Sequence, residues 1–257
     1  MKRGFFSKLQ ILLNSRKIFK NWYIYLQVYF KLTKNEYVIF ETRSGLKIKI
    51  RVNSTDLMAL THVWLIQEYA DNGFSINNDD IIIDVGAHIG LFALFASQFC
   101  KDGKIFCYEP IKENYKLLIE NIEINKIKNI FPNNLAVTKE TSRVKIFLND
   151  DQSGHSMFIQ NNNFVEVNSK SLSDIFSDNG INECDFLKLD CEGTEYEIVE
   201  SLSPDLLTKI SKTVIEYHMA DTRAELLERL INKLKQFSFS VHTKPLFIDI
   251  GFLFAKK

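Results

Sequence analysis

The feature that most constrains this chain is the run Ile81-Ile82-Ile83-Asp84-Val85-Gly86-Ala87-His88-Ile89-Gly90. Its β-branched first half is typical of a buried strand, and the two glycines predict a tight turn before a new apolar run. A strand, a tight turn and a helix start, in that order, form the place where nucleotide-like ligands bind in α/β proteins. The run therefore predicts an α/β fold with a ligand site at the end of this strand.

A second strand signal, residues 104–108, ends at the acid Glu109. An acid at the tip of the neighbouring strand is placed to accept hydrogen bonds from the two hydroxyls of a ribose. The turn after the first strand carries Asp84-x-Gly86-x-x-x-Gly90 rather than the G-x-G-x-x-G that lets a pyrophosphate approach a helix. S-adenosylmethionine has no pyrophosphate and carries a positive sulfonium, so we expect it as the cofactor. The expected cofactor-binding residues are Asp84, Gly86, His88, Gly90 and Glu109.

Strand and helix patterns alternate along most of the chain. We expect strands at 81–85, 104–109, 129–135, 185–190 and 212–218, and helices at 90–100, 112–125, 194–202 and 221–236. Strand patterns at 143–148 and 164–168 flank a polar loop at 149–157, and two aromatic-rich strands, 237–242 and 246–255, close the chain. This alternation predicts a parallel sheet with helices on both faces.

The closing pair of strands after such units is the plan of class I methyltransferases. We therefore expect an α/β, Rossmann-like class I methyltransferase fold, with a mostly parallel seven-stranded sheet and an antiparallel last strand. A basic arm, a β-hairpin (37–42 and 46–50) and a helix (55–70) precede it. The expected division is an N-terminal extension at residues 1–70 and an S-adenosylmethionine-binding methyltransferase domain at residues 71–257.

Composition fits this plan. The 257 residues are 46% hydrophobic and 25% charged, which suits one large folded domain with an extension and argues against disorder. Cys100, Cys107, Cys184 and Cys191 form no C-x-x-C pair, so we expect reduced thiols, no structural zinc and a cytoplasmic protein. The sequence contains no apolar stretch of membrane-spanning length and no signal-peptide pattern.

Charge is distributed unevenly although the net charge is zero. Residues 1–34 carry eight Lys or Arg and no acid, so residues 35–257 have a net charge of 24 − 32 = −8. Aromatic residues lie between these basic ones, a pattern that suits peripheral contact with an anionic membrane, here the inner face of the cell membrane. The alternative is an arm that packs its aromatics onto the domain. Nucleic acid is not expected as a partner, because the body of the chain is acidic.

Polar residues follow three of the expected parallel strands at the edge that faces the ligand crevice. They are Asp84 and His88, Asp190 and Glu192, and Glu216 and His218. Lys188 falls inside an otherwise apolar strand, where a lysine is costly unless it pairs with an acid. We expect it to support the site through a carboxylate rather than to act as a base.

These residues carry a resemblance to a known family. The chain resembles the FkbM family of S-adenosylmethionine-dependent methyltransferases over roughly residues 80–218, through the run at 83–90, Tyr108-Glu109-Pro110, the run at 186–195 with its Lys-x-Asp-x-Glu-Gly, and the run at 215–218. His88 departs from the family, which usually has Asn there. The resemblance implies methyl transfer to a hydroxyl, typically of a sugar, a glycan, or a macrolide or related natural product. We expect the acceptor here to be a saccharide, a glycolipid or another hydroxyl-bearing small molecule.

Methyl transfer from a sulfonium is an in-line displacement that depends mainly on positioning, although a hydroxyl nucleophile benefits from a base or a metal. The candidate catalytic residues are Asp190, His218, Glu216 and Glu192. Two arrangements remain open: Asp190, Glu216 and His218 hold Mg²⁺ and a diol, or His218 takes the proton while Glu216 orients it. Under a structural interpretation, Glu192 caps the following helix and His218 is an ordinary hydrogen-bonded residue.

Two other classes of function remain as alternatives. A nicotinamide-dependent oxidoreductase or epimerase would also use an acid such as Glu109 on a ribose, but the third glycine of the dinucleotide pattern is missing from the sequence. The other alternative is a non-catalytic module that keeps the methyltransferase fold and binds a membrane surface. Retention of the cofactor-facing acids and glycines argues against it.

Overall fold

The structure is a computed structural model that describes residues 2–69, 74–148 and 163–257, with side chains described from residue 8 onward. The polar loop expected at 149–157 lies outside the described residues. None of the described helices is both long enough and apolar enough to span a membrane.

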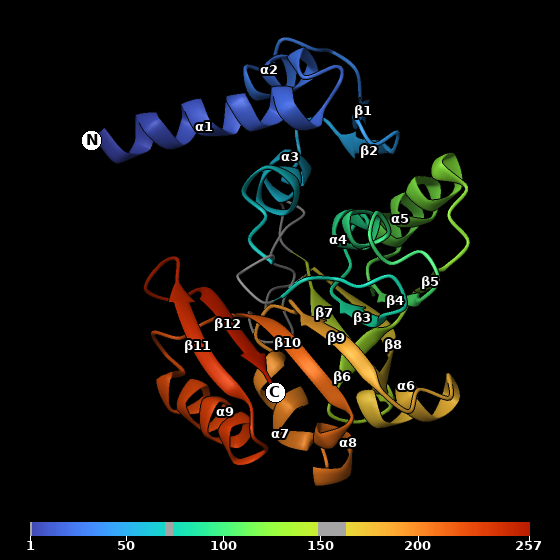
Figure 1. Ribbon diagram of the computed structural model, residues 1–257, viewed down its shortest axis with the longest axis vertical. Coiled ribbons are helices and arrows are strands. Elements are labelled where there is room, and N and C mark those ends of the chain that lie inside the picture. Colours follow the sequence, from blue (N-terminus) through green and yellow to red (C-terminus); the bar gives the residue numbers. More distant parts are fainter. Residues whose placement is uncertain (1, 70–73, 149–162) are drawn as a thin grey trace.

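Within the described residues, seven strands form one sheet in the order β11-β12-β10-β9-β3-β4-β5 (Figure 1). They are β3 (Ile81–Val85), β4 (Lys104–Tyr108), β5 (Ile130–Asn133), β9 (Cys184–Leu189), β10 (Ile210–Tyr217), β11 (Ser240–Pro245) and β12 (Gly251–Lys256). The last strand, β12, runs antiparallel to both of its neighbours, whereas the pairs from β10 to β5 are parallel. This confirms the expected fold class.

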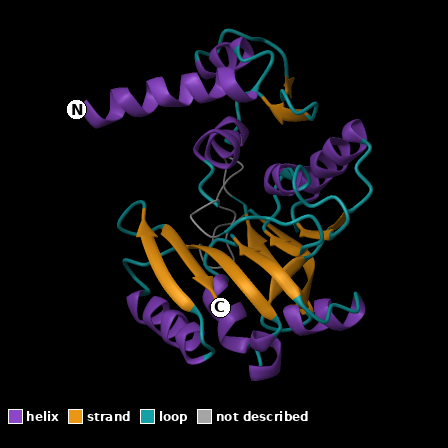
Figure 2. Cartoon of the chain, viewed as in Figure 1, coloured by secondary structure: helices purple, strands orange, loops and turns teal. Residues whose placement is uncertain are grey.

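Helices cover both faces of this sheet (Figure 2). One face carries α4 (Leu91–Ala96), α5 (Lys112–Asn125) and the N-terminal extension; the other carries α6 (Leu172–Asp178), α7 (Glu195–Ser201), α8 (Pro204–Thr208) and α9 (Ala224–Gln236). Because successive strand residues point to opposite faces, Ile82 and Phe186 join one hydrophobic cluster while Ile83 and Leu187 join the other. The sheet is therefore buried on both sides.

The N-terminal extension packs directly against this body. Its elements are α1 (Lys2–Ile18), α2 (Tyr23–Tyr29), β1 (Tyr37–Glu41), β2 (Lys47–Arg51), α3 (Asp56–Leu60) and the π-helix η1 (Thr61–Ile66). Phe19, Phe40 and Ile48 are fully buried in the same cluster as Ile82 of the central strand. The hairpin is also tied to α5, where the Asn121 side chain accepts a hydrogen bond from the Lys49 amide at 2.7 Å. The extension and the sheet thus share one core.

Two local expectations were wrong, and one strand was not expected. The helix expected at 55–70 consists of α3 followed by the π-helix η1, which ends where Gln67 adopts a left-handed conformation. The helix expected at 90–100 stops at Ala96, because the next residues form tighter i to i−3 hydrogen bonds such as Phe99 N to Ala96 O. The expected strands at 143–148 and 164–168 form β7 (Ser142–Phe147) and β8 (Phe164–Ser171), but β8 also pairs with an unexpected strand, β6 (Ala136–Thr138).

Candidate active site

An open cavity of about 250 Å³ lies at the edge of the sheet where β3, β4, β9 and β10 end. Its described wall on one side comes from α3 and η1, and on the other from the turns that follow the strands. The charged residues among the described lining are Glu68, Glu109, Asp190, Glu192, Glu216 and Lys188. With acids in clear excess, this lining suits a ligand that carries positive charge.

The turn after β3 is folded back by two hydrogen bonds at 3.0 Å, from the amides of Gly86 and Ala87 to the carbonyl of Tyr108. Gly86 has a φ of +72°, and a Cβ there would lie 1.7 Å from the backbone oxygen of Asp190. No side chain fits this contact, so the turn after β3 and the turn after β9 touch backbone to backbone. Gly86 therefore fixes the junction between two strand ends and also lines the cavity.

Gly90 serves helix packing. Its φ is +86°, and a Cβ there would lie 2.4 Å from a methyl carbon of Leu118 in α5. Gly90 is absent from the described residues that line the cavity, whereas Gly86 and His88 are among them. Of the two glycines expected to contact the cofactor, the structure places only Gly86 at the cavity wall.

Asp84 lies beneath the cavity rather than in its wall. Its fully buried carboxylate forms an ion pair with Lys188 at 3.0 Å, and these residues are direct neighbours across β3 and β9. The Lys188 ammonium also donates to the carbonyl of Gly86 at 3.0 Å and lies 3.6 Å from the Asp190 carboxylate. Burial alone would lower the pKa of Lys188, but the Asp84 and Asp190 carboxylates raise it above its usual range. Lys188 is therefore a charged support for the turn, as the sequence predicted, and not a base.

Glu109 follows β4 and is held by the backbone on two sides. One carboxylate oxygen accepts a hydrogen bond from the His88 amide at 2.8 Å, and the other accepts one from the Ile111 amide at 2.9 Å. The Asn114 side chain adds a longer bond at 3.4 Å. Burial raises the pKa of Glu109 to about 7, although these hydrogen bonds oppose the shift. The carboxylate is therefore oriented at the cavity and changes charge near neutral pH.

His88 lies next to Glu109 with a φ of +51°, a conformation that Asn adopts more easily than His. The Arg51 guanidinium, from the hairpin, lies 3.2 Å from His88 Nε2 and pairs with the buried Asp56 at 2.7 Å. The Asp56 carboxylate lies 3.4 Å from the same nitrogen, so His88 Nε2 contacts both members of the Arg51–Asp56 pair. Burial lowers the pKa of His88 to about 4. His88 is thus a neutral part of the wall.

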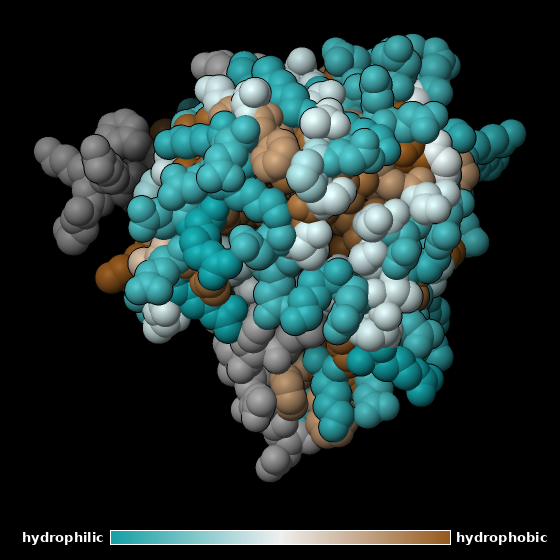
Figure 3. Space-filling view, turned by 90° about the horizontal axis from the view of Figure 1, so that it is seen from below, coloured by the Kyte–Doolittle hydropathy of each residue, from teal (hydrophilic) through white to brown (hydrophobic). Residues whose placement is uncertain are grey.

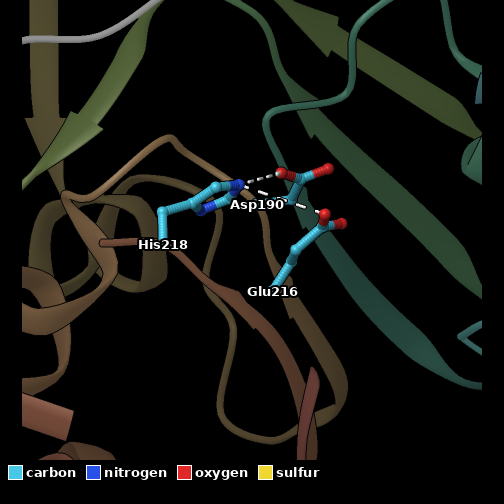
Figure 4. A group of neighbouring side chains, drawn as sticks. All are labelled: Asp190, Glu216 and His218. Atoms are coloured by element: carbon cyan, nitrogen blue, oxygen red, sulfur yellow. Dashed lines mark ion pairs between the residues drawn. The ribbon is translucent and has the colours of Figure 1, made fainter. Parts of the chain in front are cut away.

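A cluster of acidic groups and one histidine lies across the cavity from Glu109. Asp190 follows β9, Glu216 belongs to β10 and His218 follows β10, and one ligand atom from each lies within 4.8 Å of the others (Figure 4). Tyr69 joins them: its hydroxyl oxygen is 3.0 Å from Asp190 Oδ2 and 3.0 Å from Glu216 Oε2. Side chains from three distant segments of the sequence, at Tyr69, at Asp190 and at Glu216 with His218, therefore meet at one point.

The Tyr69 contacts require one additional proton. A phenol has a single proton and can donate to only one of the two carboxylates at a time, so the second short contact needs a protonated carboxyl group. Burial, together with the nearby charge of Asp190, raises the pKa of Glu216 to about 8. Glu216 therefore supplies this proton at neutral pH, and the cluster holds one exchangeable proton between Asp190, Tyr69 and Glu216.

His218 is oriented by Glu195, and not by Glu216 as one of the two open arrangements would have it. His218 Nδ1 bonds to the buried carboxylate of Glu195 in α7, which leaves Nε2 directed at the acidic cluster. Nε2 lies 3.6 Å from Glu192 and 4.0 Å from both Asp190 and Glu216. Burial opposes the charged imidazole, but Glu195 and the other carboxylates raise the pKa of His218 well above its usual range. His218 is therefore an imidazolium surrounded by acids.

Glu192 does not cap the following helix. The N-cap of α7 is Thr194, and no side-chain hydrogen bond caps that helix. Glu192 lines the cavity instead and has a positive φ of 55°. Sequence reasoning also missed Tyr69, Glu195 and the Arg51–Asp56 pair. Glu195 stands inside the 186–195 run, but only the fold shows that it faces His218.

The strand order of the sheet and the acid-lined cavity at its edge define a class I methyltransferase fold. The crystal structure of methyltransferase FkbM from Methylobacillus flagellatus is similar, with a TM-score of 0.52 and 16% sequence identity over 77% of this chain and 53% of that chain. The family model of the methyltransferase FkbM domain matches residues 84–241, and this chain belongs to that family.

Two of the curated relatives that the chain matches are named methyltransferases. The chain is 20% identical over 161 residues to methyltransferase 1 of Beauveria bassiana, and 22% identical over 184 residues to methyltransferase sdnD of Sordaria araneosa. These matches cover 54% and 58% of this chain, and 65% and 71% of the relatives. The chain thus spans about two thirds of the length of the curated relatives it matches.

Proposed function

We propose that this chain is an S-adenosylmethionine-dependent O-methyltransferase whose acceptor is a hydroxyl of a saccharide, a glycan or a glycolipid. The observation that carries the proposal is the pair of acidic sites in one cavity: Glu109 on one side, and Asp190 and Glu216, which group with the buried His218, on the other. A carboxylate pair and an imidazolium can hydrogen-bond the neighbouring hydroxyls of a sugar. Membership of the FkbM family supports methyl transfer as the reaction.

In this proposal the cofactor occupies the Glu109 side. Glu109 binds the ribose hydroxyls, Gly86 and His88 form the wall beside it, and Asp84 acts indirectly through Lys188. Gly90 acts by letting α4 and α5 pack closely. The excess of acids in the described lining fits the positive sulfonium. We keep residues 1–70 as an extension and residues 71–257 as the cofactor-binding domain, although the two share a core.

The acidic cluster takes up the proton that the acceptor hydroxyl loses. Bound S-adenosylmethionine supplies a methyl group on sulfur, and transfer breaks the sulfur–methyl bond as the oxygen–methyl bond forms. Glu216, with a pKa of about 8, accepts the proton of the acceptor hydroxyl once it is ionised, because a base works best when its pKa is near the working pH. Asp190 and the His218 imidazolium hold the acceptor oxygen in line.

Mg²⁺ fits these residues poorly. The two carboxylates suit a hard cation, but the imidazole nitrogen of His218 is a softer ligand than the oxygen atoms that Mg²⁺ prefers. Lys188 also places a positive charge 3.6 Å from Asp190. We therefore route no step through a metal. Methyl transfer that continues in excess EDTA would agree with this assignment, and transfer that requires added Mg²⁺ would contradict it.

Calorimetric titration of the full chain with S-adenosylmethionine, S-adenosylhomocysteine and NAD⁺ tests the cofactor. We expect binding of the first two ligands and its loss in Glu109→Ala. Binding of NAD⁺ alone would support the oxidoreductase alternative instead.

Transfer of labelled methyl groups to saccharide acceptors tests the reaction. Glu216→Gln keeps the shape of the side chain but cannot take a proton, so we expect it to bind S-adenosylmethionine normally and to transfer methyl groups at least about 100-fold more slowly. Full activity in Glu216→Gln would remove Glu216 as the base. Cofactor binding by the wild type without transfer to any acceptor would favour the non-catalytic alternative.

A further inference from the structure

All charged side chains of residues 8–34, the N-terminal arm, are positive. Every basic residue of the arm is exposed: Lys8, Arg16, Lys17, Lys20, Lys31 and Lys34. The sequence has no acid before Glu36, while residues 35–257 carry a net charge of −8 by the counts above. An anionic surface would therefore attract the arm and repel most of the remaining molecule.

Large apolar side chains are exposed between these charges. In α1, Leu9 and Leu13 are 44% and 46% exposed and share one helix face with Arg16, since the three are spaced i, i+4 and i+7. Just after α2, Phe30 is 60% exposed and Leu32 is 72% exposed. Exposed leucine and aromatic side chains beside lysine and arginine are the pattern of helices that lie in a lipid headgroup layer.

The opposite side of the arm is fixed to the wall of the cavity. The Asn14 side chain donates to the Leu65 carbonyl at 2.7 Å, and the hydroxyls of Tyr25 and Thr61 are 2.8 Å apart. Both partners belong to η1, whose neighbouring residues His62 and Val63 line the cavity. The arm is therefore positioned relative to the active site by packing and not by a linker.

The two ends of the molecule also differ in their surface composition. The arm forms one end of the molecule along its longest axis (Figure 1), and the opposite end, seen in Figure 3, is covered mainly by hydrophilic residues. Outside the arm, the two most exposed large apolar side chains in the described part are Ile248 (86%) and Phe247 (71%). They lie in the turn between β11 and β12, at the sheet edge where β10 ends beside Glu216. These two side chains thus lie at the same edge of the sheet as the cavity.

We propose that the arm docks this protein onto an anionic lipid bilayer, with the exposed leucines and aromatics in the headgroup layer and the cavity held beside it. The inference goes beyond the proposed function and does not depend on it, because it concerns a surface outside the catalytic residues. The arm cannot simply be removed to test it, since Phe19 is fully buried in the shared core. Surface substitutions in the full chain are the appropriate test.

Co-sedimentation with vesicles measures the docking. The full chain should bind vesicles made of equal parts phosphatidylglycerol and phosphatidylcholine, and should remain in solution with phosphatidylcholine alone. Each Lys or Arg near an anionic surface contributes about a fivefold factor in binding. Arg16→Glu/Lys17→Glu should therefore weaken partitioning by at least about 30-fold.

Matched variants on α5 separate docking from a simple loss of net charge. Lys112→Glu/Lys116→Glu changes the net charge by the same amount at exposed helix positions away from the arm. Ile124→Glu, at an apolar side chain that is 38% exposed, is matched to Leu13→Glu. The proposal requires both arm variants to lose vesicle binding and both α5 variants to keep it. Equal losses in the two sets, no binding by the wild type, or binding to RNA without binding to vesicles would each overturn it.

Discussion

The buried pair of Lys188 and Asp84 gives the sharpest test of how this site is held together. The side chain of Lys188 is only 4% exposed and that of Asp84 is fully buried. Lys188→Met keeps the length of the side chain but leaves a buried carboxylate without its cation. It also removes the 3.0 Å hydrogen bond to the Gly86 carbonyl. Breaking a buried ion pair from one side costs about 3–5 kcal/mol, so we expect the free energy of unfolding to fall by about 4 kcal/mol.

The pH dependence of this loss has a definite sign. Burial already raises the pKa of Asp84 in the wild type, and removal of Lys188 raises it further. A carboxyl whose folded pKa exceeds its unfolded value costs stability above the unfolded pKa, and this cost grows until pH passes the folded pKa. The difference in unfolding free energy between wild type and Lys188→Met should therefore shrink from pH 8 to pH 5, by up to about 1.4 kcal/mol per pH unit.

Urea unfolding followed by circular dichroism and tryptophan fluorescence measures these quantities. Asp84→Asn in the Lys188→Met background removes the unpaired charge and should restore about 2 kcal/mol. Lys235→Met, at an exposed lysine of α9, is the control and should change stability by less than about 0.5 kcal/mol. A loss below about 1 kcal/mol in Lys188→Met, or no recovery with Asp84→Asn, would refute the assignment of the pair as the support of the turn.

Three other positions give independent tests. Because burial raises the pKa of Glu109 to about 7 and the ribose needs the ionised form, calorimetry should show about tenfold tighter S-adenosylmethionine binding at pH 8 than at pH 6, and no such gain in Glu109→Gln. In urea unfolding, Gly86→Ala should lower the free energy of unfolding by at least about 3 kcal/mol, because its Cβ would clash with the Asp190 backbone. Gly180→Ala, with a similar φ but open space around it, should lower it by about 1 kcal/mol, and equal losses would remove the backbone contact as the cause. Glu195→Gln should move the His218 titration in NMR spectra to lower pH, and an unmoved titration would contradict the orienting role.

The sequence was sufficient for the sheet because its strands are short, apolar and bounded by polar residues. The strand expected at 81–85 matches β3, and the helix expected at 112–125 matches α5. Prediction from the sequence failed where the local pattern is weak. A three-residue strand such as β6 has no period to detect, and the π-helix η1 shares its apolar spacing with an α-helix closely enough to be mistaken for one.

The candidate site was predictable where a residue follows a strand, since strand ends of a parallel sheet share one edge. Asp190, Glu216 and His218 do meet there. The partners of these residues were not predictable. Glu195 reaches His218 only through the packing of α7 on β10, and Tyr69 arrives from a segment more than a hundred residues earlier in the chain. Such contacts depend on tertiary structure and leave no local signature.

The contact between Gly86 and the Asp190 carbonyl has a consequence for how the substrate range of this chain could be changed. Two backbones that touch cannot be brought closer, and any Cβ at Gly86 would push them apart, so this contact fixes the spacing between the turn after β3 and the turn after β9. The opposite wall, which α3 and η1 build from side chains such as Met58 and His62, has no such constraint. The cavity thus combines a rigid frame with a wall whose side chains can be exchanged to admit other acceptors.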